Sequence, residues 1–328
     1  MNKTTRAIMR VLDKHTGIIG SREISRELKR YGIDLTERTV RYHLRLLDAQ
    51  GFTKVFGKEG HRITERGKEE LKHGLVSEKV GFMISKIETL SYLTTLDLDT
   101  LRGEVILNVS FLPEESLADA MATLRTVFSS PYVMSDRMIL KRSGEAIGEM
   151  TVPEGKVALG TVCSVTINGL FLKAGIPVAS RFGGVAEIRD AGPARFTALI
   201  SYEGSSLDPL EIFIRSRMSN VLGAVTTRSG SVLASFREIP VVCREEAQRL
   251  AEKMDGRGLK GILMIGNPNS PLLEVPVGID KAGIVIVGGL NPVAAVEEMG
   301  IPTESKAMSA LYEYAHMESF DDLLRRGA

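Results

Sequence analysis

The chain has 328 residues, of which 43% are hydrophobic, and a formal net charge of +1. It contains no apolar run long enough to cross a bilayer, so the sequence predicts no membrane span. Its two cysteines, Cys163 and Cys243, belong to no Cys/His cluster, which argues against a metal site. Two cysteines without a signal peptide are typical of a reducing compartment, and we expect a cytoplasmic protein.

The charge is unevenly distributed along the chain. Residues 1–79 carry 18 lysines and arginines against 11 aspartates and glutamates, whereas the remaining 249 residues carry 24 against 30. A basic segment joined to an acidic one indicates that only the basic segment binds a polyanion.

Residues 1–75 are predicted to form a winged helix-turn-helix domain. Its expected elements are three amphipathic helices, a β-hairpin and a last helix, over 5–15, 21–31, 37–50, 52–64 and 65–73. Ser21, Thr36 and Thr64 are the predicted N-caps of three of these helices. This order is typical of winged-helix DNA-binding domains, in which helices, a tight turn, a further helix and a hairpin wing follow one another.

The third helix of this domain has two faces. Val40, Leu44 and Leu47 form an apolar stripe, and the opposite face is predicted to enter a DNA groove. The groove candidates are Arg38, Arg41, Tyr42 and Arg45. The candidates for phosphate contacts, which position the domain without reading sequence, are Lys54, Lys58, His61 and Arg62. Alone, an arginine-faced helix is more often a solvated surface, and some winged helices bind proteins or RNA. The complete order of three helices and a hairpin wing, with its basic charge, favours double-stranded DNA as the partner.

Residues 76–102 are predicted to connect this domain to the rest of the chain. A heptad seam, too short for an independent coiled coil, is formed by Val76, Val80, Met83, Ile87 and Leu90. The seam is expected either to pack on the rest of the chain or to pair with a second copy. Because a winged helix that reads a two-half operator needs a twofold partner, we expect a homodimer.

Residues 103–328 are predicted to form an α/β (α+β) regulatory domain built from two similar halves, about 103–205 and 230–328. Residues 149–181 align without gaps with 274–306, and both segments end in Gly-Ile-Pro, two further residues, Ser and a cation. Such a repeat indicates two copies of one α/β unit. Further expected elements include a strand and two helices, over 157–165, 170–174 and 210–222.

Two facing copies commonly form a cleft, and polar residues of the repeat are candidates to line it. Arg181 and Lys306 are expected to meet near the pseudo-twofold axis, where two cations beside hydroxyls suit a small dianion. The alternative is that the repeated pattern is a structural turn and that Arg181 forms a surface ion pair.

The sequence carries no signature of an enzyme. It lacks the G-x-G-x-x-G, phosphate-loop and G-x-S-x-G motifs, and its one histidine beyond the basic segment is His316. We therefore predict no catalytic residues, no cofactor and no metal. An enzyme with a DNA-binding domain is the alternative, which a turnover assay would separate from a regulator.

Two segments carry a resemblance to a known family. VSEKVGFMISKIE occupies 76–88, and GTVCSVTINGLFLKAGIPV occupies 160–178. Together with the winged-helix order, they resemble the NrpR family of archaeal nitrogen-regulation repressors over nearly the whole chain. The resemblance implies a repressor of nitrogen-assimilation genes that binds inverted-repeat operator DNA as a dimer and is released by 2-oxoglutarate.

2-Oxoglutarate is a small dianion, which suits the cations and hydroxyls of the repeat. The candidate effector residues, chosen from the repeat, are Thr161, Cys163, Ser164, Ser180, Arg181, Ser305 and Lys306. Some family members carry two regulatory domains in tandem, whereas this chain has one, which implies a second repressor subunit of the same family as a partner. The alternative interpretations are a regulator that senses a different metabolite, such as an amino acid or a nucleotide, and a co-repressor that binds another subunit more than DNA.

Overall fold

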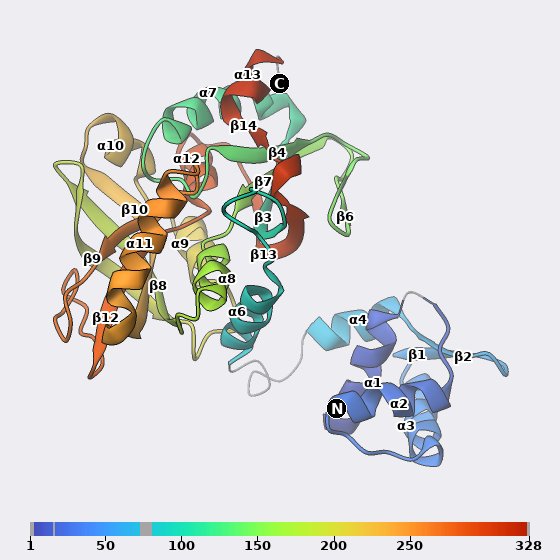
Figure 1. Cartoon of the computed structure of the whole chain (residues 1–328). Coiled ribbons are helices and arrows are strands. Elements are labelled where there is room, and N and C mark those ends of the chain that lie inside the picture. Colours follow the sequence, from blue (N-terminus) through green and yellow to red (C-terminus); the bar gives the residue numbers. More distant parts are fainter. Residues whose placement is uncertain (1–2, 16, 73–80, 327–328) are drawn as a thin grey trace. The chain divides into compact units, whose positions relative to one another are not determined.

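The structure is a computed structural model that describes residues 3–15, 17–72 and 81–326. It consists of two compact units, Met1–Lys79 and Val80–Ala328 (Figure 1). The expected connector is therefore not separate, because its described part belongs to the second unit; Val76 and Val80 of the heptad seam lie outside the described residues. Every helix in the described ranges is too short or too polar to cross a bilayer.

The first unit is a winged helix, as predicted. Its elements are α1 (Lys3–Lys14), α2 (Ser21–Arg30), α3 (Glu37–Ala49), the antiparallel hairpin β1 (Thr53–Phe56) and β2 (Gly60–Ile63), and α4 (Glu65–Lys72). Val40, Leu44 and Leu47 are fully buried and pack with Ile24 and Leu28 in one core. The helical periodicity located these elements because one face of each helix packs on a shared core.

Two of the three predicted caps are confirmed. The side chains of Thr36 and Thr64 accept hydrogen bonds from backbone N–H groups of α3 and α4, at 3.2 and 3.0 Å. The prediction for Ser21 was wrong: Gly20 is the N-cap of α2, and the Ser21 hydroxyl donates to the Glu37 carboxylate at 3.2 Å. Ser21 therefore connects α2 to the start of α3.

The second unit contains two five-stranded antiparallel sheets. The strands of the first sheet are β8 (Ala179–Arg189), β9 (Gly192–Ser201), β10 (Gly230–Pro240), β11 (Ile262–Ile265) and β12 (Lys281–Val287). The strands of the second are β3 (Glu104–Pro113), β4 (Arg137–Lys141), β7 (Lys156–Val162), β13 (Glu304–Glu313) and β14 (Glu318–Ser319). Their spatial orders are β11-β12-β10-β8-β9 and β13-β3-β7-β4-β14, and a short hairpin, β5 (Ala146–Ile147) with β6 (Met150–Thr151), projects beside them.

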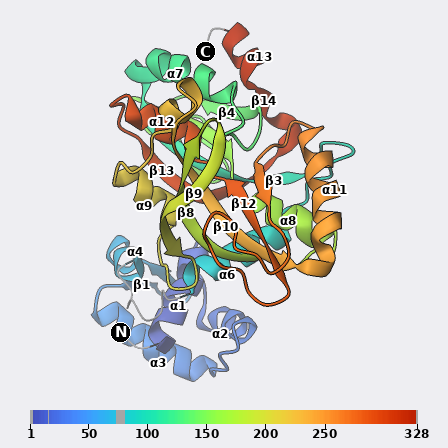
Figure 2. The ribbon, with the colours of Figure 1, turned by 90° about the vertical axis from the view of Figure 1, so that its left-hand side faces the viewer.

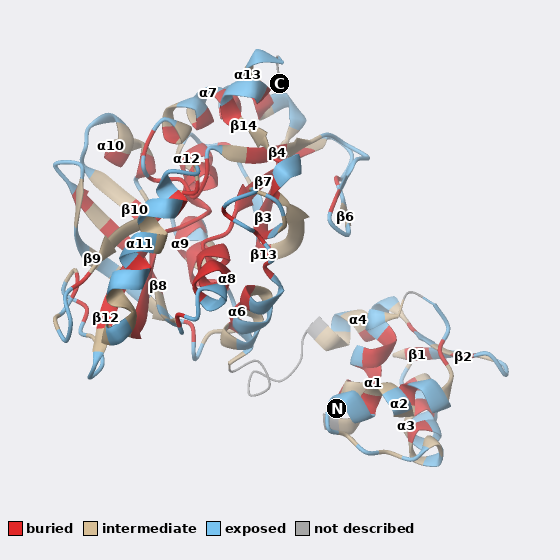
Figure 3. Cartoon of the chain, viewed as in Figure 1, coloured by how far each residue is buried: buried red, intermediate tan, exposed pale blue. Residues whose placement is uncertain are grey.

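Helices pack on these sheets and between them. They are α6 (Phe82–Leu93), α7 (Leu117–Phe128), α8 (Val165–Lys173), α9 (Pro209–Arg215), α10 (Val221–Thr226), α11 (Arg244–Asp255), α12 (Asn291–Glu298) and α13 (Phe320–Arg325). Every residue from Val165 to Phe171 of α8 is buried, which Figure 3 shows as a red helix inside the unit. Met83 and Ile87 of α6 are buried in the same unit, so the described part of the heptad seam packs on its own chain.

Three element boundaries differ from the sequence predictions. The strand expected over 157–165 ends at Val162, and the helix expected over 170–174 already begins at Val165. The helix expected over 210–222 is two helices, α9 and α10. Between them the backbone of Arg217 is left-handed, with φ 52°, and the Asn220 side chain caps α10, so a continuous helix cannot form.

The order of elements occurs twice in the second unit. β3, α7, β4, β7, α8 and β8 recur as β10, α11, β11, β12, α12 and β13. The two copies exchange their last strands: β8 pairs with β10 of the second copy, and β13 pairs with β3 of the first. The two halves are therefore interlocked, because each sheet contains strands of both copies. Figure 2 shows β8 and β9 of the first copy beside β10 and β12 of the second.

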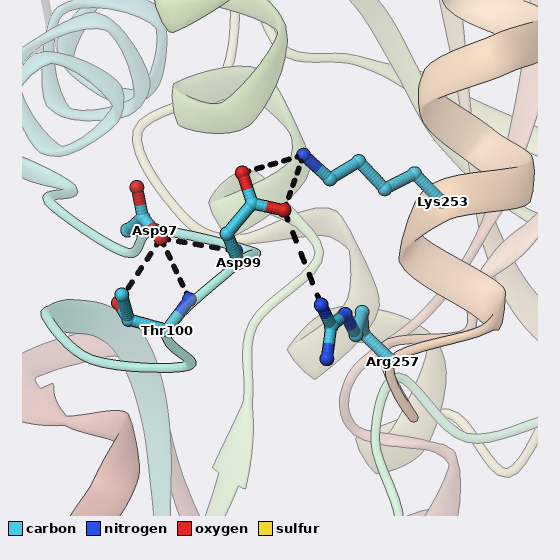
Figure 4. A network of polar contacts seen from close by, with 5 residues as sticks. All are labelled: Asp97, Asp99, Thr100, Lys253 and Arg257. Carbon is cyan, nitrogen blue, oxygen red and sulfur yellow. Dashed lines mark hydrogen bonds and ion pairs between the residues drawn. The ribbon is translucent and has the colours of Figure 1, made fainter.

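Ion pairs join the segment that follows α6 to α11 and the residues just after it. Asp97 accepts hydrogen bonds from the backbone and side chain of Thr100, which lower the pKa of its carboxyl group. Asp99 pairs with Lys253 at 2.8 Å and lies 4.0 Å from Arg257 (Figure 4). These exposed ion pairs add little stability, but they connect the segment after α6 to the second copy.

Candidate functional site

The exposed face of α3 carries the predicted groove contacts. Arg38, Arg41, Tyr42 and Arg45 are all exposed, and Tyr42 is 59% exposed. Arg41 lies 3.5 Å from Glu37 one turn earlier on the helix. Because the apolar stripe of α3 faces the core, the opposite face presents these side chains to solvent.

The hairpin adds a second group of cations. Lys54 and Arg62 are cross-strand partners, and both lie over the Phe56 ring, at 5.7 and 5.1 Å from its centroid. Lys58 is exposed near the turn. His61 is different: its side chain is only 13% exposed, and its Nδ1 lies 3.1 Å from the Asp48 carboxylate. The structure therefore gives His61 a partner inside the first unit, which disfavours its predicted phosphate contact.

The second unit contains a cavity of about 530 Å³ between α6, α8 and the ends of β8 and β9, which we name the α6–α8 cavity. Its polar and charged lining residues are Glu88, Ser91, Asn168, Ser180, Arg181, Ser201 and Glu203. Two of the predicted effector residues, Ser180 and Arg181, thus lie side by side in one cavity. Its volume is within the usual range for sites that bind small molecules.

Arg181 reaches this cavity from β8. Its side chain is 48% exposed, its Nε lies 3.6 Å from the Glu238 carboxylate, and its guanidinium lies 5.9 Å from the Phe182 ring centroid. The ion pair is long and partly solvated, so it is weak. A carboxylate ligand can compete with Glu238 for this guanidinium.

Behind Ser180 lies a buried chain of hydrogen bonds. Asn168 donates through Nδ2 to the Ser180 hydroxyl at 3.0 Å and accepts through Oδ1 from Arg237. Arg237 also donates to the Ser164 carbonyl and hydroxyl, both at 3.0 Å. Burial lowers the pKa of Arg237 to about 10, so its guanidinium stays charged at neutral pH.

The predicted effector residues Thr161 and Cys163 are buried outside this cavity. The Thr161 hydroxyl donates to the Gly289 carbonyl at 2.8 Å, so it joins β7 to the turn that precedes α12. Burial raises the pKa of the Cys163 thiol to about 12, which keeps it neutral and unreactive. Ser164 touches the cavity only through Arg237 and Asn168.

Ser305 and Lys306 lie elsewhere, and the expectation that Arg181 meets Lys306 was wrong. They line a second cavity of about 530 Å³, the α6–α9 cavity, whose other charged lining residues are Lys86, Asp208, Glu211, Arg215 and Glu304. The two residues are separated because β8 and β13 belong to different sheets. Ser305 shares a hydrogen bond of 2.8 Å with Ser110, and Lys306 lies over the Phe111 ring.

Neither Asn168 nor Arg237 was predicted from the sequence. Asn168 stands within the aligned repeat, opposite Val293, and this polar-for-apolar difference was a usable signal. Arg237 lies outside the aligned segment, and its contact with Asn168 spans 69 residues of sequence. In the described ranges, no group of three or more His, Cys, Asp or Glu side chains has the arrangement of a metal site.

The comparisons with known proteins agree with this organisation. A family model described as NrpR regulatory domains NRD1 and 2 matches residues 80–319, and one described as the ribonuclease R winged-helix domain matches residues 6–71. The Global nitrogen regulator NrpRI of Methanosarcina mazei is 37% identical over 95% of this chain and 96% of its own length. The chain belongs to the NrpR family. The family predicted from the sequence is thus confirmed.

Other NrpR relatives differ in length. The Global nitrogen regulators NrpR of Methanococcus maripaludis and Methanocaldococcus jannaschii are 30% and 31% identical over 95% and 93% of this chain, which spans only 54% and 52% of their lengths. The crystal structure of a nitrogen repressor-like protein from Methanococcus jannaschii is 30% identical, with a TM-score of 0.62 over 73% of this chain and 98% of that structure. This chain thus shares its fold with that structure over 73% of its length.

Proposed function

We propose that this chain is a DNA-binding repressor of nitrogen-assimilation genes and that 2-oxoglutarate, bound in the α6–α8 cavity, releases it from operator DNA. Membership of the NrpR family supports the regulatory role. One observation carries the rest: a winged helix with an exposed cationic face is joined to a second unit whose cavity holds an arginine and hydroxyl groups.

The exposed cations of the first unit support DNA as the partner. In the described residues, Arg38, Arg45, Lys54, Lys58 and Arg62 have no acidic partner within 4.0 Å, so their charges are available to phosphates. Neutralising phosphates releases counterions and makes binding strongly dependent on salt. A homodimer would present two such faces to an inverted-repeat operator.

The lining of the α6–α8 cavity supports a small carboxylate as the effector. Arg181 can hold one carboxylate with two hydrogen bonds, and the Ser180 and Ser201 hydroxyls lie in the same lining. Glu88 and Glu203 lie there too, so a dianion at Arg181 repels Glu88 on α6. The same two acids favour an α-amino acid as a second candidate, because an ammonium group would pair with them.

Helix α6 is suited to transmit ligand binding. Ile84, Ile87, Glu88 and Ser91 of this helix line the cavity, and the helix is the first of the second unit after the winged helix in sequence. A ligand that displaces Glu88 would shift α6 and change how the two winged helices match the operator. Linkage then requires that DNA weaken effector binding by the same factor, for a coupling of about 1–3 kcal/mol.

The proposal is tested by fluorescence anisotropy on a labelled operator fragment at fixed salt. We expect 2-oxoglutarate to weaken binding, and glutamate and glutamine to do so less. Arg181→Ala should abolish the response while leaving DNA affinity unchanged, because Arg181 lies outside the winged helix. Arg189→Ala, an exposed arginine of the same strand that pairs with Glu187, should respond as the wild type does.

Three outcomes would change the proposal. Unchanged DNA binding in 2-oxoglutarate would remove this effector, and a stronger response to glutamate or glutamine would favour the amino-acid alternative. An isolated chain that ignores operator DNA even at low salt would favour a co-repressor that needs a second subunit. The NrpR relatives of which this chain spans only about half make such a subunit a specific alternative.

A further inference from the structure

Arg237 is a buried cation whose hydrogen-bond partners among the described residues carry no charge. Its side chain is 1% exposed, its described partners are the uncharged groups of Ser164 and Asn168, and its Nε has no partner among the described residues. Removing a guanidinium from water without a paired charge is costly. Such a group normally has a carboxylate beside it, so the structure leaves a positive charge that is only partly compensated.

The fold does not require this charge, because the same architecture forms without it in the other copy. Ser180 faces Arg237 across β8 and β10, and the equivalent pair across β13 and β3 is Ser305 facing Ser110. The position of Asn168 is taken by Val293, which is fully buried. The second copy thus has a small hydroxyl and an apolar side chain where the first has a guanidinium and an amide.

The chemistry of the chain fixes the direction of every hydrogen bond. A guanidinium only donates, so Asn168 must turn its oxygen to Arg237 and its NH₂ group to Ser180. The Ser180 oxygen accepts that bond, which leaves the Ser180 hydroxyl hydrogen to be donated. No acceptor for that hydrogen is present among the described residues, and Asn168, Ser180 and Arg181 all line the α6–α8 cavity.

We propose that Arg237 is a positioning residue for an anion subsite in the α6–α8 cavity, at which Ser180 and Arg181 donate to a carboxylate group of the ligand. Arg237 holds the Asn168 amide in its orientation, Asn168 turns Ser180 into a donor, and the buried positive charge is compensated when the anion binds. The inference rests on the proposed function in that the cavity takes a small carboxylate. It adds that the carboxylate binds at the end of the cavity where Ser180 and Arg181 lie, and it explains why only one of the two copies has such a subsite.

The substitution Asn168→Asp gives the sharpest test. The introduced carboxylate pairs with Arg237 inside the protein and accepts the Ser180 hydroxyl hydrogen. It therefore compensates the buried positive charge that the anionic ligand would otherwise compensate. We expect the full-length variant to melt no lower than the wild type in ligand-free buffer. Its affinity for 2-oxoglutarate in isothermal titration calorimetry should fall by about tenfold to a hundredfold, the usual effect of losing a hydrogen bond to a charged group.

Two further variants complete the test. Asn267→Asp makes the same change of charge at an exposed asparagine and should leave affinity unchanged. Ser180→Ala removes the donor without touching Arg237 and should also weaken binding. Wild-type affinity in both Asn168→Asp and Ser180→Ala would overturn the inference while leaving the proposed effector intact.

If the wild type does not bind 2-oxoglutarate, the effector assignment fails separately. Titration with succinate, glutarate, sulfate and glutamate then decides the inference: an anion that binds the wild type and is lost in Asn168→Asp supports the subsite. A wild type that binds none of these anions would overturn the subsite as well.

Discussion

Asp208 is a buried carboxylate at the start of α9. Its side chain accepts hydrogen bonds from the backbone of Leu210 at 2.8 Å and Glu211 at 3.3 Å, so it caps the helix. Burial and, to a smaller extent, the neighbouring Glu211 carboxylate raise the pKa of Asp208 to about 6. At neutral pH the folded chain therefore carries a carboxylate that is costly to keep charged.

This cost predicts how Asp208→Asn changes stability with pH. The pKa of Asp208 is raised from 3.8 to about 6 in the folded chain. The stability that protonated Asp208 contributes is therefore fully present below about pH 4 and is lost as the pH rises through 6. Asparagine keeps the capping oxygen without the charge. At pH 8 the variant should be more stable by up to about 2 to 3 kcal/mol, and the difference should vanish towards pH 4.

Urea unfolding midpoints between pH 4 and pH 8 measure this difference. Asp190→Asn, at an exposed aspartate whose left-handed backbone (φ 50°) asparagine tolerates, is the control and should show little change. A gain in stability that is the same at every pH would show that the carboxylate of Asp208 is not the cause.

At the scale of elements, the contact between α6 and α8 depends on a glycine. A Cβ on Gly169 would lie 2.5 Å from the Thr94 Cβ and 2.7 Å from the Ser91 carbonyl oxygen. Alanine in a helix is otherwise favourable by about 1 kcal/mol. The glycine therefore allows the end of α6 to approach α8 closely, beside the cavity that both helices line.

Gly169→Ala should separate these two helices. We expect a net loss of about 1–3 kcal/mol in the free energy of unfolding and a reduced effect of 2-oxoglutarate on DNA binding, because α6 no longer sits against the cavity. Gly192→Ala, where the nearest atom is 3.7 Å away, should change neither quantity. Chemical unfolding and operator anisotropy measure the two effects, and a stabilised Gly169→Ala variant would contradict the close contact.

Helices and strands with one buried face could be predicted from the sequence. The boundaries of elements that are buried on all sides could not. In the winged helix, the spacing of Val40, Leu44 and Leu47 reveals α3, because the other face of this helix is polar. The apolar run through Val157 to Phe171 has no such period, so the end of β7 and the start of α8 could not be separated. Ser164 forms no side-chain cap that would have marked the boundary.

The candidate cavity was only half predictable for a related reason. The repeat pointed to Ser180 and Arg181 because they recur in sequence. It also pointed to Ser305 and Lys306, which line another cavity, because a sequence repeat does not show that β8 and β13 lie in different sheets. The exchange of strands between copies leaves no periodic signal either. Asn168 and Arg237 come together only through that exchange, which pairs β8 with β10.

At the scale of the whole chain, the two copies of the second unit share their sheets. Without β13, β3 loses a neighbour along most of its length, and without β10, β8 keeps only β9. Each copy alone would expose a long strand edge and the apolar faces that the other copy covers. Such edges pair readily with other chains.

Separate expression of the halves tests this interdependence. Residues 80–328, which retain both copies, should unfold in one cooperative transition, whereas residues 103–205 should not fold as a monomer. Any folded form of the shorter fragment should be a dimer in which β8 of each chain takes the place that β13 occupies beside β3, since exchange of equivalent elements is an easy route to dimers. Light scattering with near-ultraviolet circular dichroism distinguishes these states, and a folded monomer of residues 103–205 would show that the exchanged strand is dispensable.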